Sequence, residues 1–189
     1  MIRKVSHAPS QLALVLAGFA VVLLMSAASV WLIRQTQATN ERLTRALTVN
    51  TLIATMRADL RRAESGQRGF LLTGNAAYLN DYNATRGRLL PEVEQLLGLA
   101  GSEADAQARI GPLRGLMDKK LAELAQTIDL ELSGRHQEAL ALVATDEGLA
   151  LTQQITQDLT DMAQPESAVI AASRKSADRG DLALFVVHL

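Results

Sequence analysis

The side chains that most often carry out chemistry in proteins are few and scattered in this sequence. Its three histidines are His7, His136 and His188, and it contains no cysteine. Thiolate chemistry, disulfides and cysteine-ligated metals are therefore excluded. The histidine spacing fits neither a metal site, nor a nucleophile beside a base, nor a phosphoacceptor, and no phosphate-binding loop occurs. We expect no catalytic activity, no cofactor and no metal.

The charged residues are almost balanced, with 19 Lys and Arg against 20 Asp and Glu. This balance argues against nucleic-acid binding. Glu64 and Arg68 are four residues apart, in the order that favours a helix ion pair worth about 0.2–0.5 kcal/mol. A group of arginines near the distal turn could hold an anion: Arg61, Arg62, Arg68, Arg86 and Arg88.

Asn50 and Glu166 are polar residues at positions that the apolar pattern described below predicts to be buried. Polar residues at such positions often fix register or the choice of partner. At 1.5 Å per residue, both would lie about 20–25 Å above the membrane, a height at which they could face each other. We interpret them as a possible polar layer.

The first element that the sequence predicts is a membrane helix. Gln11 to Ile33 contains no charged residue, and as a helix it would be about 34 Å long, against about 30 Å for the hydrocarbon core. Arg3 and Lys4 before it predict that residues 1–10 are a cytoplasmic tail. A cleavable signal peptide, cut near Ser26 to Ser29, is the alternative. We favour an uncleaved anchor, which places the following residues outside the cytoplasm.

A second apolar stretch begins at Asp181 and runs to the end of the sequence at Leu189. Two interpretations remain open: a tail that docks on the rest of the protein, or the start of a second membrane helix that is cut off. We favour the second.

Between these stretches, residues 34–180 show the three-and-four spacing of apolar residues that is typical of helix bundles. The composition agrees, since aromatic residues make up only 3%. The first helix should continue from the membrane to about Thr73, where Gly74 ends it and Asn75 caps the next. Its core positions are predicted to be Leu43, Leu47, Asn50, Ile53, Met56, Leu60, Ala63, Gln67 and Phe70.

Three further long helices are expected, over about 76–99, 103–132 and from about Leu151 to Gly180. Gly98 to Ser102 forms a turn, and a short helix over 136–144 lies between breaks at Ser133-Gly134 and at 146–148. We expect bends at Pro91 and Gly111-Pro112.

The apolar pattern also predicts which positions of these three helices are buried. They are Tyr78, Tyr82, Leu89, Val93, Leu96 and Ala100; then Ile110, Leu113, Met117, Leu121, Leu124 and Ile128; then Leu151, Ile155, Leu159, Met162, Glu166, Val169 and Ser173. The predicted fold is all-α: a transmembrane helix followed by an antiparallel up-down-up-down four-helix bundle.

One segment resembles a known family signature. Its residues are Glu64, Gly66, Gln67, Arg68, Gly69, Phe70, Leu71, Leu72, Thr73, Gly74, Tyr78 and Leu79. This pattern is similar to that of the third class of CHASE domains, which are extracellular sensory modules of histidine kinases and cyclases, and the resemblance covers roughly residues 38–177. Pro165-Glu166-Ser167 departs from the unbroken charged helix that is usual there and predicts a kink.

The role of the signature residues can be structural or ligand-binding, and we favour the structural role. Gly66 and Gly69 would let a neighbouring helix come close, while Gln67 and Arg68 would tie the far end of the bundle together. A bundle of this family implies a periplasmic sensor between two membrane helices of the bacterial inner membrane. The output would be a kinase, a cyclase or a chemotaxis-type module.

We therefore expect a signal-input region that acts through small shifts of its first and last helices. Its expected partners are the lipid bilayer, which its apolar helix would cross, and a second copy of the chain in a homodimer. The stimulus is not indicated by the sequence. The alternative is a membrane-anchored structural protein whose external domain dimerises without any signalling output.

Overall fold

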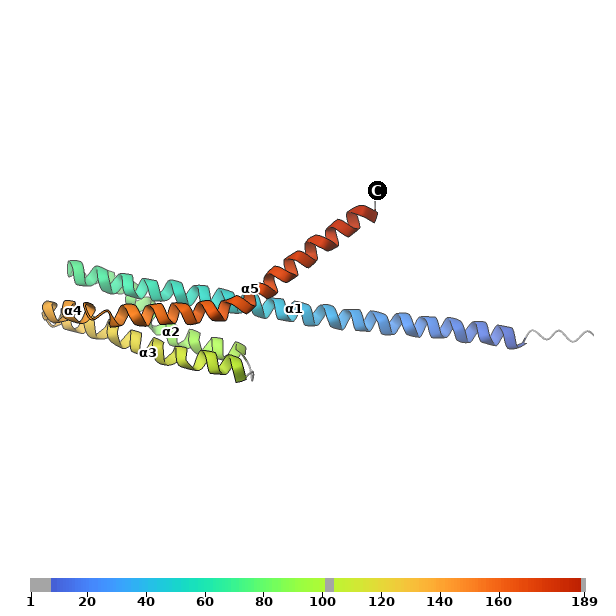
Figure 1. Cartoon of the computed structure of the whole chain (residues 1–189), viewed down its shortest axis with the longest axis horizontal. Coiled ribbons are helices and arrows are strands. Elements are labelled where there is room, and N and C mark those ends of the chain that lie inside the picture. Colours follow the sequence, from blue (N-terminus) through green and yellow to red (C-terminus); the bar gives the residue numbers. More distant parts are fainter. Residues whose placement is uncertain (1–7, 101–103, 188–189) are drawn as a thin grey trace, which may run out of the picture. The chain divides into compact units, whose positions relative to one another are not determined.

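The computed structural model describes residues 8–100 and 104–187, and this part of the chain is helical throughout apart from short turns. The elements are α1 (Ala8–Thr73), a 3-10 turn η1 (Ala76–Tyr78), α2 (Leu79–Ala100), α3 (Ala104–Leu132), α4 (His136–Val143) and α5 (Glu147–Val187) (Figure 1). The chain forms two compact units, and the boundary between them lies between Leu43 and Thr44.

In the first unit, α1 carries the apolar stretch that the sequence singles out. Every side chain from Leu16 to Arg42 is exposed, including Phe19 and Trp31. Among the described residues, α1 is the helix long and apolar enough to cross a membrane. The Ser29 hydroxyl donates to the Met25 carbonyl at 2.8 Å, so this polar group is satisfied inside its own helix. An apolar surface of this size fits a lipid environment.

Some expectations fall outside the described residues. They are the residues of the tail up to His7, among them Arg3 and Lys4; the end of the turn at Gly101 and Ser102, with Glu103 after it; and His188 and Leu189. The side chain of Ala100, a predicted core position, also lies outside the described part. For the apolar stretch from Asp181, the helical backbone of α5 is described up to Val187, and its side chains are not.

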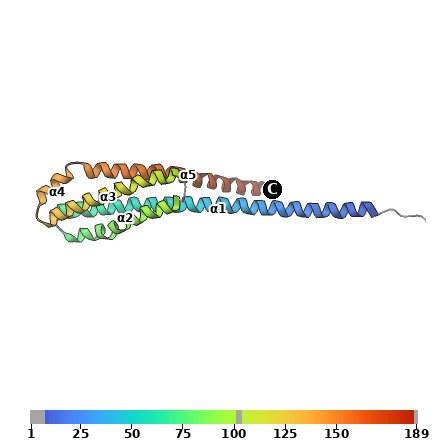
Figure 2. The same ribbon diagram turned by 90° about the horizontal axis from the view of Figure 1, so that it is seen from below.

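In the second unit, the remainder of α1 packs with α2, α3 and α5 around a main hydrophobic core (Figure 2). Each of the four long helices runs antiparallel to the one before it, as Figure 2 shows, with α4 between α3 and α5. The most deeply buried side chains are Ile53, Met56, Leu89, Val93, Leu113, Met117, Leu124, Ile155 and Leu159. The predicted all-α bundle is confirmed.

The helix ends lie where the turn residues predict. Gly74 has a φ of +66°, which favours glycine, and its N–H donates to the Phe70 carbonyl at 2.8 Å. The Asn75 side chain then accepts from the N–H of Ala77 at 2.9 Å, so it caps the next element as expected. The break after Leu132 is likewise present, with Gly134 at a φ of +74°.

Three predicted core positions are wrong. Leu47 is 45% exposed, because the buried stripe of α1 passes through its neighbours Ala46 and Val49 instead. Tyr78 is 46% exposed, because it belongs to the 3-10 turn rather than to α2. Val169 is 38% exposed, since burial along α5 weakens after Met162.

The prolines Pro91, Pro112 and Pro165 all lie inside helices, and none of them ends its helix. All three are exposed, so the carbonyl left without a donor can reach water. Figure 1 shows a bend in the middle of α5, the part that contains Pro165 and the expected kink.

Candidate functional site

The last turns of α1, from Glu64 to Thr73, carry most of the signature, and two of the signature residues face the start of α2. A Cβ added to Gly66 would lie 2.7 Å from the Tyr78 carbonyl oxygen and 3.1 Å from the Tyr82 nitrogen. A Cβ added to Gly69 would lie 2.4 Å from the Tyr78 ring. Any side chain at these positions would collide with α2 or its leading turn, so the two glycines permit a close approach of the two segments.

An aromatic cluster lies beside these glycines. Phe70 and Tyr82 are buried together with Ala63 of α1 and with Leu124 and Ile128 of α3. Leu79, the last residue of the signature, packs against the edge of the same cluster. The signature therefore forms a small separate core where the α1–α2 turn meets α3.

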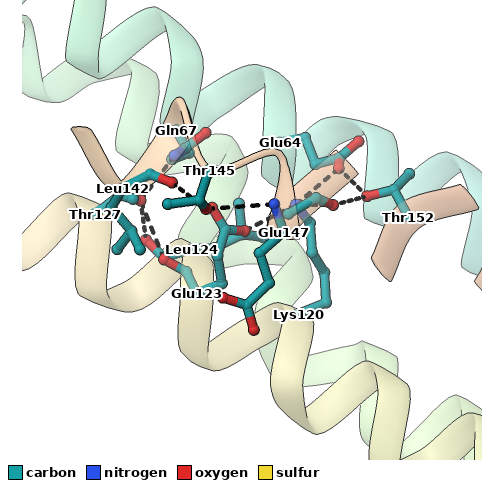
Figure 3. Close-up of polar contacts among 11 residues, drawn as sticks. Glu64, Gln67, Lys120, Glu123, Leu124, Thr127, Leu142, Thr145, Glu147 and Thr152 are labelled. Carbon is teal, nitrogen blue, oxygen red and sulfur yellow. Dashed lines mark hydrogen bonds and ion pairs between the residues drawn. The ribbon is translucent and has the colours of Figure 1, made fainter. Parts of the chain in front are cut away.

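Glu64, the first signature residue, points in another direction, toward α3 and α5 (Figure 3). Its Oε1 lies 3.1 Å from Nζ of Lys120 and accepts a hydrogen bond from the hydroxyl of Thr152. Lys120 also contacts Oε2 of Glu123 at 2.8 Å and donates to the Gly148 carbonyl at 3.1 Å. A single ammonium group therefore bridges α1, α3 and the first turn of α5.

Gln67 adds a second connection between α1 and α3. Its Nε2 donates to Oγ1 of Thr127 at 2.7 Å, and both side chains are buried. The Thr127 hydroxyl donates in turn to the backbone carbonyl of Leu124 at 2.9 Å. We call Glu64, Gln67, Lys120, Glu123, Thr127 and Thr152 the signature network.

The signature network is almost dry. The Lys120 side chain is 5% exposed, and those of Glu64 and Glu123 are 15% and 10% exposed. A buried lysine between two carboxylates is held by charge and by hydrogen bonds, and removing one partner leaves an uncompensated buried charge. The arrangement of the signature network suits the fixing of helices relative to one another. Among the described residues, no group of three or more acidic, His or Cys side chains could hold a metal ion.

The expected ion pair between Glu64 and Arg68 does not form, because the Glu64 carboxylate is taken by Lys120 and Thr152. Arg68 is exposed. The sequence alone does not show that a lysine on a distant helix competes for Glu64.

Asp59 lies among the arginines of the expected anion site, and its carboxylate would compete with a bound anion for them. Its Oδ2 accepts from Nε of Arg88 at 2.7 Å, and its Oδ1 lies 3.8 Å from Arg62. Arg86 lies over the ring of Tyr82, 5.3 Å from its centroid. Two of the five arginines are therefore directed at a carboxylate of the protein.

Close to Asp59, on α2, lies a second buried carboxylate. Glu92 is 9% exposed, and its Oε2 has no hydrogen-bond partner. Burial raises the pKa of Glu92 to about 7, with a further contribution from the charge of Asp59 and a partial offset by Arg88.

Asn50 and Glu166 are both partly exposed rather than buried. Nη2 of Arg57 donates to Oγ1 of Thr160 at 2.7 Å, which fixes the antiparallel register of α1 and α5. Asn50 lies seven residues before Arg57, and Glu166 six residues after Thr160, so this register supports similar heights for the two. No hydrogen bond or ion pair joins them in the described part of the chain.

Sequence reasoning missed Lys120, Thr127 and Thr152, which contact signature residues, and Glu123, which contacts Lys120. A signal for Lys120 existed, because it lies three residues after Met117 and four before Leu124, both of them core positions. The adjacent pair Lys119-Lys120 is easily taken for a solvated charged face. The spacing separates the two: Lys119 is exposed and Lys120 is buried.

Comparison with known proteins places this bundle in a sensor family. Residues 39–176 match the family model of the CHASE3 domain. The crystal structure of the sensor domain of the Rhodopseudomonas palustris histidine kinase HK9 is similar, with 28% sequence identity and a TM-score of 0.59. That similarity covers 66% of this chain and 98% of the HK9 chain. A comparison with curated proteins gave no match. Because the matched segment covers most of this chain, the chain belongs to the CHASE3 family of sensor domains.

Proposed function

We propose that this sensor domain is the input region of a membrane receptor and that its output is a cytoplasmic kinase or cyclase module. The observation that carries the proposal is the bridge made by Lys120 between Glu64 of α1 and Gly148 of α5. α1 contains the apolar stretch at 11–33, and α5 runs into the apolar residues from Asp181. The two helices that would enter the membrane are thus joined through one buried ammonium group.

The mechanism that we infer is a small relative shift of α1 and α5. The bundle is closely packed around Met56, Met117 and Leu159, while burial along α5 decreases beyond Met162. A stimulus that alters the packing would therefore displace the weakly packed part of α5 more easily than the part near Lys120. Helix shifts of about 1–2 Å are sufficient in other signalling proteins.

For the orientation, we propose a cytoplasmic N-terminus and an exported bundle in the bacterial inner membrane. Arg3 and Lys4 before the apolar stretch support it. A second membrane helix beginning near Asp181 would return the chain to the cytoplasm. We also propose a homodimer, which light scattering of the purified protein would test: a mass of one chain per particle contradicts pairing.

The experiment is a chimera. The chain is fused through α5 to the kinase module of a receptor whose own sensor has been removed, in several versions that each differ by one linker residue. We expect kinase activity that varies with the linker register, because rotation of α5 would change the output, and that changes again with Lys120→Met. Since the kinase module needs cytoplasmic ATP, activity also tests the orientation. Kinase activity that is the same in all versions and in the Lys120→Met variant would contradict the proposal and favour a purely structural role.

A further inference from the structure

A groove between α1 and α2 brings together polar side chains that the signature network does not use. It has a volume of about 490 Å³. Its lining is formed by Thr44, Leu47, Thr48, Thr51, Leu52, Thr55, Glu92 and Gln95. Glu92 is the one acidic side chain in this lining, and its Oε2 is buried without a hydrogen-bond partner. A buried, unsatisfied carboxylate oxygen is costly to a fold and indicates that a partner belongs there.

The charge around Glu92 shows what kind of partner is missing. The charges that act most on the pKa of Glu92 are those of Asp59 of α1, which raises it, and Arg88 of α2, which lowers it. Arg88 is engaged with Asp59 at 2.7 Å, so these two side chains neutralise each other. Among the ion pairs of the described residues, those of Arg62 and Arg88 are made to Asp59 and none is made to Glu92, so a bound cation would give an ionised Glu92 a partner.

Two threonines of the groove restrict the hydrogen bonds that this partner can make. The hydroxyl of Thr48 donates to the Thr44 carbonyl at 2.9 Å, and the hydroxyl of Thr55 donates to the Thr51 carbonyl at 3.0 Å. Because these hydroxyl protons are already used, the oxygens of Thr48 and Thr55 can only accept a further hydrogen bond. The contact between Asp59 and Arg88 sets the antiparallel register of α1 and α2, and four residues further along, this register places Thr55 level with Glu92.

We propose that this groove binds a small organic ammonium ion, whose N–H groups donate to Glu92 and Thr55 and whose apolar part lies against Leu47 and Leu52. Leu47 is 45% exposed, so an apolar body would cover a side chain that the bundle leaves in contact with water. Binding at this site does not depend on the signalling role proposed above. A failure to bind would leave that role untouched.

The binding test uses phenethylamine as the probe and phenethyl alcohol as its uncharged match of the same shape. Full-length protein in nanodiscs of neutral lipid is titrated calorimetrically at about pH 8, with empty nanodiscs subtracted. We expect saturable binding of the amine and much weaker binding of the alcohol. Glu92→Gln should weaken amine binding about tenfold or more, because the counter-charge is lost. Thr55→Val, which removes one acceptor from an exposed position, should weaken it several-fold.

The matched control is Glu94→Gln, which removes an exposed carboxylate two residues away on the same helix, paired with Arg114. It should leave the affinity unchanged. Amine affinity should also fall as the pH is lowered to about 5.5, because the cation requires an ionised Glu92. Equal amine affinity in wild type and the folded Glu92→Gln and Thr55→Val variants, equal affinity for the alcohol, or the absence of saturable amine binding would each overturn the proposal.

Discussion

Nζ of Lys120 on α3 lies 3.1 Å from Oε1 of Glu64 on α1, and both side chains are almost fully withdrawn from water. The contact joins the first signature residue to a helix that begins 40 residues later, at Ala104. Through the Gly148 carbonyl, the same ammonium group also holds the first turn of α5. In this chain the signature residues of α1 therefore have two structural roles within about two helical turns: the glycines receive the start of α2, and the polar residues connect α1 to α3 and α5.

Replacing Lys120 by Met should destabilise the bundle strongly. The substitution keeps the length of the side chain but leaves Glu64 and Glu123 buried without their shared cation, which costs about 3–5 kcal/mol. Lys119→Met is the matched control, since Lys119 is exposed and its loss should change stability by no more than about 0.5 kcal/mol. Chemical denaturation followed by circular dichroism compares the two variants. Similar unfolding free energies for them would show that the ammonium bridge contributes little.

Gly66→Ala and Gly69→Ala should both be destabilising, by about 1–3 kcal/mol. Gly66 should be the more sensitive position, because its added Cβ would meet backbone atoms of Tyr78 and Tyr82, whereas at Gly69 it would meet the ring of the half-exposed Tyr78, which can move. Thermal unfolding measures both variants.

Gly115→Ala serves as the control for these glycine substitutions. Gly115 lies inside α3 with open space where a Cβ would be, so alanine there should stabilise the protein by about 0.5–1 kcal/mol. If all three variants shifted stability in the same direction, the close approach at the signature would not be a constraint on the fold.

Glu92 predicts a pH dependence of stability. In the folded chain its pKa is raised from 4.5 to about 7. The folded state therefore binds more protons than the unfolded state between these values, so the contribution of Glu92 to stability falls as the pH rises through this window. At about pH 8, Glu92→Gln should be more stable than wild type by about 1–3 kcal/mol, and the difference should shrink toward about pH 5. Denaturation curves at both pH values for the two proteins measure it, and a constant difference would contradict the prediction.

The polar layer of Asn50 and Glu166 remains a prediction. Replacing both residues by Leu should stabilise the bundle by about 1 kcal/mol, since each is partly buried. The double variant should also hold the kinase chimera in one output state. Gln164→Leu, at an exposed position of α5, is the control. A double variant that is less stable and signals normally would show that the two residues are ordinary solvated positions.

Periodicity and turn residues were sufficient to predict most of the fold, because helix bundles are specified locally. The end of α1 at Thr73 followed from Gly74 and Asn75, and the break after Leu132 followed from Gly134. The assignment of Leu47 to the core was wrong by one residue, because a strict seven-residue repeat drifts relative to a helix of 3.6 residues per turn.

The polar contacts of the site were less predictable. The close approach at Gly66 and Gly69 could be inferred, since glycines at this spacing inside a helix have few other uses. The partners of Glu64 could not be inferred, because they come from α3 and α5, and the apolar repeat does not determine which side chains of those helices lie opposite Glu64. The spacing of Lys120 between Met117 and Leu124 was the one local indication.

The signature network should fix α1 relative to α5, and a distance measurement tests this directly. Because the chain has no cysteine, single spin labels can be placed at the exposed positions Ala54 and Gln164 without background labelling. Double electron–electron resonance in nanodiscs should give one narrow distance distribution for the labelled parent and for its Lys119→Met control. With Lys120→Met, the account predicts a distribution that is broadened or shifted by about 1–2 Å or more. An unchanged narrow distribution in a folded Lys120→Met variant would show that the network does not hold the two helices together.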